Sequence, residues 1–180
     1  MQGVNKGFTL IELVSVIVLL GILAVTASSK FINFEDDALI ATHKATAASF
    51  KQAINLAHIK WRAEGYTTGV EEFNIYPQST KNIDMNRFGW PAQSYPHGNE
   101  SPDALDLNNG ADCQSVWNQV LDDNSARAAE QGRNNDYVNA NEADYVVEYI
   151  ATAQCRYRHV KKNTLTVSYN AHTGEVSVGL

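Results

Sequence analysis

The amino-acid sequence predicts an α+β fold, in which one long amino-terminal helix packs on a small antiparallel sheet of three or four strands. The first observation is an apolar run from Phe8 to Ala27, followed by a segment without proline or glycine that reaches Glu64. The second is the alternation of apolar and polar residues over 145–178, which is typical of half-buried strands. Between them lies a stretch rich in Gly, Pro, Asn and Asp, as expected of loops.

The apolar run FTLIELVSVIVLLGILAVTA has the length of a membrane anchor. Twenty helical residues span roughly 30 Å, the thickness of the hydrocarbon core of a bilayer. Lys6 precedes the run, so the carboxy-terminal part should face away from the cytoplasm. An ordinary signal peptide cut after Ala27 is the alternative. It is disfavoured because the run is longer than a usual signal core and contains Glu12.

Glu12 is the only ionisable residue between Phe8 and Ala27. A carboxylate in hydrocarbon costs about a few kcal/mol and is usually functional where it occurs. The alternative is that Glu12 lies near the membrane edge and reaches the headgroups.

The helix is expected to continue well beyond the apolar run. Residues 28–64 are rich in alanine, and Gly65 supplies a carboxy-terminal cap. Apolar side chains recur there at spacings of three and four, so this half should be amphipathic and cover a sheet. We interpret His43, which falls on the stripe, as a packed residue with satisfied hydrogen bonds. The stripe comprises Ile40, His43, Ala47, Phe50, Ile54, Ala57 and Trp61.

The segment GFTLIEL resembles the processing motif of type IV prepilins and of the related pseudopilins of type II secretion, with Gly7, Phe8 and Glu12 at the matching positions. The resemblance implies that prepilin peptidase cuts between Gly7 and Phe8 and methylates the new terminus, giving N-methylphenylalanine at Phe8. The freed amine would lie one helical turn from Glu12. In a filament core of low dielectric, Glu12 of one subunit can pair with the Phe8 amine of a neighbour and set the register of assembly.

The resemblance also implies a pilin-like domain order. We expect a leader peptide at 1–7, the transmembrane half of the helix at 8–27, its amphipathic half at 28–65 and a globular head at 66–180. In the head, 66–142 is a loop-rich variable region and 143–180 is the antiparallel sheet. Many pilins kink the helix with a proline at the position of Ser29, and serine cannot impose that kink.

The variable region contains two predicted elements. Residues 83–86 are a candidate short strand, and a short helix capped by Asp112 or Ser115 should run through Val116, Trp117, Val120 and Leu121. The polar residues 122–142 are expected to be exposed. The element Gly89-Trp90-Pro91 resembles one in pili of the MSHA type, the mannose-sensitive haemagglutinin family.

The end of the chain should form the sheet. Strands are expected at 145–150, 155–159, 164–169 and 176–178, separated by turns at 161–163 and 172–174. If the domain is exported, Cys113 and Cys155 should form one disulfide, the alternative being two buried thiols. Closing a loop of about forty residues would stabilise the fold by roughly 3–4 kcal/mol. In pilins such a bridge commonly joins the variable region to the sheet.

Composition argues against several other functions. The net charge of -6 disfavours a nucleic-acid partner, which would need a clustered basic face. We interpret the basic residues at 156, 158, 161 and 162 as a solvated strand edge, the alternative being a small basic patch. No nucleophile-elbow, phosphate-loop or HExxH pattern occurs, so we expect neither an enzyme nor a cofactor.

Two ligand sites are conceivable from residue type and are not favoured. Asp103, Asp106 and Asp112 are candidate calcium ligands, since calcium prefers carboxylate oxygens. Their order and spacing match no EF-hand, however, so we expect a solvated loop and no metal. Trp90, Tyr95 and Trp117 are candidates for a sugar-binding platform, and we expect core packing instead.

The resemblance therefore implies a structural subunit, a pilin or minor pilin of a type IV pilus, assembled into or at the tip of a filament for attachment. Its partners would be other pilin subunits, prepilin peptidase, the inner-membrane assembly platform and the membrane. It would sit in the inner membrane as a single-pass protein with a periplasmic head, and become extracellular on assembly. The alternatives are a type II secretion pseudopilin and a membrane-tethered adhesin or ligand-binding minor pilin.

Overall fold

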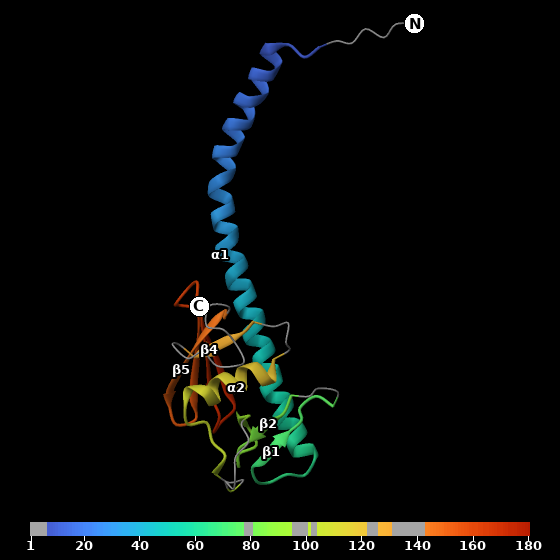
Figure 1. The fold of residues 1–180 in the computed structure, drawn as a ribbon, viewed down its shortest axis with the longest axis vertical. Helices are drawn as coiled ribbons and strands as arrows, with labels where there is room; N and C mark the ends of the chain where they lie inside the picture. Colours follow the sequence, from blue (N-terminus) through green and yellow to red (C-terminus); the bar gives the residue numbers. More distant parts are fainter. Residues whose placement is uncertain (1–6, 78–80, 95–100, 102–103, 122–125, 131–142) are drawn as a thin grey trace, which may run out of the picture. The chain divides into compact units, whose positions relative to one another are not determined.

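The computed structural model describes residues 7–77, 81–94, 101, 104–121, 126–130 and 143–180, with the backbone alone at 28–33. The chain divides into two compact units, Met1–Ala41 and Thr42–Leu180, and we call the second unit the head. One helix, α1 (Leu10–Ala63), contributes to both units, and the remaining elements belong to the head (Figure 1). The predicted α+β class is confirmed.

Helix α1 ends where the sequence predicts. Its last residue is Ala63, and Gly65 follows with a φ of 82°, the left-handed conformation that glycine adopts without steric cost. The Gly65 N–H donates to the Arg62 carbonyl at 3.1 Å, and the Tyr66 N–H donates to the Trp61 carbonyl at 3.3 Å. These bonds satisfy carbonyls that a helix end leaves open. The backbone is helical through residues 28–33, which include Ser29.

The main sheet has five strands in the order β4-β5-β6-β7-β8. Strands β5 (Tyr145–Ala151), β6 (Gln154–His159), β7 (Thr166–Asn170) and β8 (Glu175–Gly179) pair antiparallel, as predicted. Strand β4 (Ala128–Glu130) pairs parallel to β5 and was not predicted. The expectation that 122–142 is entirely exposed is therefore wrong at β4, where Ala128 and Ala129 are buried. Residues 122–125 and 131–142 lie outside the described part of the chain.

A second sheet, which was also not predicted, has three antiparallel strands in the order β1-β2-β3. These are β1 (Val70–Phe73), β2 (Ile83–Met85) and β3 (Pro91–Gln93), and only β2 was expected. Asn86 holds the turn after β2 in place. Its side-chain oxygen accepts from the Phe88 and Trp90 N–H groups at 3.0 and 3.1 Å, and its nitrogen donates to the Ala171 carbonyl at 2.7 Å.

Helix α2 (Gly110–Val120) begins earlier than predicted. Its cap is Asn109, whose side chain accepts from the Asp112 N–H at 3.0 Å, while the Asp112 carboxylate accepts from the Asn109 N–H at 3.2 Å. This reciprocal arrangement is a capping box, so Asp112 is the third helical residue and not the cap. Ser115 lies inside the helix and donates to the Asp112 carbonyl. Figure 1 shows α2 lying across the main sheet, where it contacts β4, β5 and β6.

The core of the head joins α1, α2 and the main sheet around Phe50. This ring is fully buried and lies 4.8 Å from the Trp117 ring, 5.4 Å from Tyr157 and 5.8 Å from Tyr169, centroid to centroid. Six members of the predicted stripe are buried, and they come from one face of α1. They are His43, Ala47, Phe50, Ile54, Ala57 and Trp61. The part of α1 that belongs to the head therefore packs on the sheet through this stripe.

Candidate functional site

The amino-terminal part of α1 carries a continuous apolar surface. The window Leu10–Ala27 has a mean hydropathy of 2.6, and none of it is buried. Phe8 and Leu10 expose 78% and 80% of their surface. By length and composition this segment can cross a membrane, and apolar side chains left so exposed require an apolar surrounding, either lipid or other helices.

The one acidic residue in this surface, Glu12, has partners at the helix start. Its carboxylate oxygen Oε2 accepts from the Thr9 N–H at 2.9 Å and from the Thr9 hydroxyl at 2.8 Å. The Glu12 N–H donates to the Thr9 hydroxyl oxygen at 3.4 Å. Thr9 and Glu12 thus form a capping box, with Thr9 as the cap and Glu12 as the third helical residue.

This cap places a negative charge beside the amino end of α1. The first amide groups of a helix point their N–H bonds outwards, and the helix dipole favours an anion there. The residue before the cap is Phe8, so a cationic amine at Phe8 would lie next to the same carboxylate. The local fold therefore presents Glu12 toward the point where the motif predicts a new amino terminus.

Among the residues that the structure describes, none packs closely enough against Gly7 to require a glycine there. Gly7 is exposed, and a Cβ added there would meet no atom within 4 Å. A requirement for glycine at this position must therefore come from outside the folded chain, as it would if an enzyme has to accommodate the backbone.

The disulfide is present between the predicted cysteines. Cys113 of α2 and Cys155 of β6 are bonded, with their Cα atoms 5.7 Å apart. Both are buried, and the Tyr157 hydroxyl donates to the Cys113 carbonyl at 2.8 Å. The bridge joins the variable region to the sheet, as expected from the family resemblance.

The two candidate calcium ligands that the structure describes, Asp106 and Asp112, have other partners. Asp106 pairs with His172 at 2.8 Å and accepts from the Leu107 N–H, while Asp112 accepts from the Asn108 and Asn109 N–H groups. Asp103 lies outside the described residues. Among the residues that the structure describes, no group of three His, Cys, Asp or Glu side chains is placed to hold a metal ion.

Of the three aromatic residues considered as a sugar platform, the structure describes Trp90 and Trp117. Trp117 is fully buried in the core. Trp90 stacks on His58 with ring centroids 3.8 Å apart and an interplanar angle of 10°. Tyr95 lies outside the described part of the chain. The expectation of core packing holds for Trp117.

Sequence reasoning missed Thr9 as a partner of Glu12. The signal was present, because a threonine followed three residues later by a glutamate is the pattern of a capping box. It also missed the parallel strand β4 and the partners that the sheet gives to His43, which depend on tertiary contacts.

Comparison with known proteins gives one family match and one curated relative. The family described as the prokaryotic N-terminal methylation motif matches residues 4–28. The type IV narrow pilus major component PilA5 of Thermus thermophilus is 44% identical over 63 residues, which are 35% of this chain and 53% of that protein. The chain thus matches about half the length of this curated relative. No solved structure matches the chain.

These findings define the class as proteins with an N-terminal methylation motif, an apolar first helix and an α+β head. Within that class, the two matches make the chain similar to type IV pilins and their prepilins. The methylation-motif match lies at the amino terminus, over residues 4–28, and includes the first part of α1.

Proposed function

We propose that this protein is a structural subunit of a type IV pilus, either a pilin or a minor pilin. The observation that carries the proposal is the methylation motif at 4–28, in a chain that is similar to the major component of a type IV narrow pilus. The bilayer-length apolar helix that follows supports it, because such a helix can serve first as an anchor and later as the filament core.

Processing is the first step of the proposed function. Prepilin peptidase cuts between Gly7 and Phe8, removes residues 1–7 as a leader and methylates the Phe8 amine. The exposed Gly7 backbone, where even an added Cβ would have no atom within 4 Å, supports a site that an enzyme can reach. Before assembly the subunit is a single-pass inner-membrane protein with a periplasmic head, and after assembly it is part of an extracellular pilus.

Assembly then depends on the pairing of Glu12 with an amine. In the filament core, the Glu12 carboxylate exchanges part of its bonding to Thr9 for the methylated amine of a neighbouring subunit's Phe8. A charge that is left unpaired in a low-dielectric core is costly, so only the register that pairs it is favourable. Other pilin subunits, prepilin peptidase and an inner-membrane assembly platform are the partners that this route requires.

A pseudopilin of a type II secretion system is the second candidate, because the motif and the helix serve both machines. The Cys113–Cys155 bridge favours the pilus, since major pseudopilins usually lack a disulfide at the end of the head. A role in attachment, as an MSHA-type or tip subunit, is a finer form of the same proposal. The buried Trp117 removes one residue from any aromatic sugar platform on the head.

The experiment that tests the proposal compares filaments with membranes. Cells that produce the chain are sheared, and the released filaments and the membrane fraction are probed with an antibody against the head. The proposal expects the chain in surface filaments and fewer filaments when its gene is removed, with protein secretion unchanged. A chain that never leaves the membrane fraction, or a deletion that stops secretion and spares the filaments, would overturn it.

A further inference from the structure

A buried histidine links α1 to the sheet through both of its ring nitrogens. His43 exposes 1% of its surface, its Nδ1 lies 2.8 Å from the Tyr145 hydroxyl of β5, and its Nε2 lies 3.1 Å from the Gly179 carbonyl of β8. A carbonyl only accepts, so Nε2 carries the hydrogen and Nδ1 accepts from Tyr145. A charged ring at this buried position would be almost without contact with water, so burial favours the neutral imidazole.

A second histidine lies on the other side of the same tyrosine. The His159 ring of β6 packs edge-on against Tyr145, with centroids 5.0 Å apart, and the His43 ring is stacked on it at 5.8 Å. His159 exposes 7% of its surface, and its Nδ1 accepts from the Lys161 N–H at 3.1 Å. A proton on Nδ1 would remove that acceptor, so His159 too fits this arrangement only when it is neutral.

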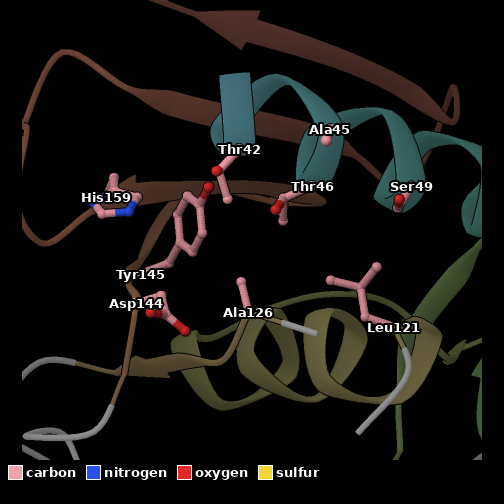
Figure 2. Close-up of a pocket in the computed structure, with 9 residues that line it drawn as sticks. All are labelled: Thr42, Ala45, Thr46, Ser49, Leu121, Ala126, Asp144, Tyr145 and His159. Carbon is pink, nitrogen blue, oxygen red and sulfur yellow. The ribbon is translucent and has the colours of Figure 1, made fainter. Parts of the chain in front are cut away.

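Solvent reaches this cluster through a hollow of about 430 Å³. Figure 2 shows Tyr145 pointing its hydroxyl toward the α1 turn at Thr42 and Thr46, with His159 beside it and the Asp144 carboxylate nearby. Protons can therefore reach the His159 ring, which lines the hollow, without prior unfolding of the head.

We propose that His43 and His159 form an acid-sensitive latch, which holds the Thr42–Ala63 part of α1 on β5, β6 and β8 when both rings are neutral and loosens that contact when they take up protons. Protonated His43 would place a positive charge where only 1% of the residue's surface is exposed to water. Two imidazolium rings would also flank one tyrosine, and like charges that close repel.

The surroundings of the two histidines shift their pKa values in opposite directions, and burial is the largest influence. Burial lowers the pKa of His43, while the carbonyls of Gly179 and Thr166 act against that shift. Burial also lowers the pKa of His159; Asp144 acts against it, and His43 and Lys161 add to it. Tyr145 stays neutral throughout, because burial raises its pKa to about 12.

The lowered pKa values of the two histidines determine how the stability of the folded head changes with pH. An unfolded histidine titrates near pH 6.5, and the folded ones titrate below it. Between the pKa of the folded histidine and that of the unfolded one, the unfolded state binds more protons. The folded state is therefore most stable above about pH 6.5 and loses stability as the pH falls. The folding equilibrium constant falls by up to about tenfold per histidine for each pH unit in that window.

The test uses the full-length chain in detergent micelles, unfolded by urea at pH values from 5 to 8. Tryptophan emission is the readout, since Trp117 is buried with its ring 4.8 Å from that of Tyr145. The variants His43→Gln, His159→Gln and their combination keep a neutral polar group at each position. We expect the double variant to lose most of the decline in stability below pH 6.5. The control His172→Gln, at a partly exposed pair with Asp106, should retain it.

An equal acid decline in the double variant, or a flat profile in the natural chain, would overturn the latch. A second measurement covers the case in which the double variant does not fold. Histidine ring signals of the natural chain, labelled with ¹³C and assigned with the single variants, are followed by NMR against pH. The latch requires His43 and His159 to titrate below pH 6.5, and titration of both at or above that value contradicts it.

Discussion

Glu12 has two roles that follow one another in the proposed life of the subunit. In the single chain, its carboxylate closes the amino end of α1 through the Thr9 N–H and hydroxyl at 2.9 and 2.8 Å. These bonds satisfy an acid that the apolar surface around it cannot solvate. In the proposed mature subunit the same carboxylate would lie beside a new cationic amine, so the cap would hold Glu12 ready for the proposed assembly.

The variant Glu12→Gln separates these two roles. Glutamine can still accept from Thr9 and close the helix, but it carries no charge to pair with an amine. We expect membrane insertion at the natural level and a fall of at least about tenfold in filament incorporation, which corresponds to about 1.4 kcal/mol. Quantitative immunoblots of sheared filaments and of membranes measure both quantities.

The matched control for this variant is Thr9→Val, which removes the hydroxyl and keeps both the N–H bond and the charge. Its effect on incorporation should be clearly smaller. Entry of Glu12→Gln subunits into filaments at the natural level would contradict the pairing role.

A core residue offers a second test at the same scale. Phe50 is fully buried against Trp117 of α2, Tyr157 of β6 and Tyr169 of β7. The variant Phe50→Ala therefore removes the ring contacts that join α1 to α2 and to the main sheet. We expect a loss of about 3–5 kcal/mol in the free energy of unfolding, measured by urea titration of the full chain in micelles. Leu56→Ala, on the same helix but 44% exposed, should cost far less. Equal losses would show that the core is not organised around Phe50.

At the scale of the elements, the disulfide joins helix α2 to strand β6. The first is stabilised by local interactions and the second by pairing with other strands. Helix α2 is fixed locally by its capping box at Asn109 and Asp112, whereas β6 is fixed by its pairing with β5 and β7. The bond between Cys113 and Cys155 closes a loop of 42 residues and limits how far the unfolded chain can separate these elements.

Removal of this bond should therefore destabilise the head strongly. We expect the double variant Cys113→Ala/Cys155→Ala to lose about 4 kcal/mol of unfolding free energy, the chain-entropy value for such a loop. Urea titration gives the loss, and reduction of the natural chain with dithiothreitol should reproduce it. A variant as stable as the oxidised chain would mean that the bridge is incidental to the fold.

The elements that the sequence predicts well are those with a strong period. The buried residues from His43 to Trp61 recur every three or four positions, which is the period of a helix buried on one face. In β6 the buried residues Cys155, Tyr157 and His159 recur every second position, which is the period of a strand buried on one face. The GFTLIEL segment is recognisable for a different reason, because its spacing of glycine, phenylalanine and glutamate is specific at the level of single residues.

The elements that were missed lack such a period. Strand β4 is Ala-Ala-Glu, three residues with little β propensity, and it forms only because β5 supplies a parallel partner. Strands β1 and β3 are four and three residues long, and β3 begins with a proline. The partners of His43 depend on the register of β5 and β8, which no local pattern reveals.

For the whole molecule, the central claim is that one chain is first a membrane precursor and then a filament subunit. The apolar window Leu10–Ala27 would serve both states, because lipid and neighbouring helices are equally apolar surroundings. The two states would differ in the amino terminus, since the proposed mature subunit begins at Phe8.

Intact-mass spectrometry of the chain purified from its native cells tests this claim most directly, with fragmentation to read the first residues. The account predicts a mature chain that begins at Phe8, carries one added methyl group on its amine and retains the Cys113–Cys155 bond. A mature chain that begins at Ser28, as an ordinary signal peptidase would leave it, would contradict the account.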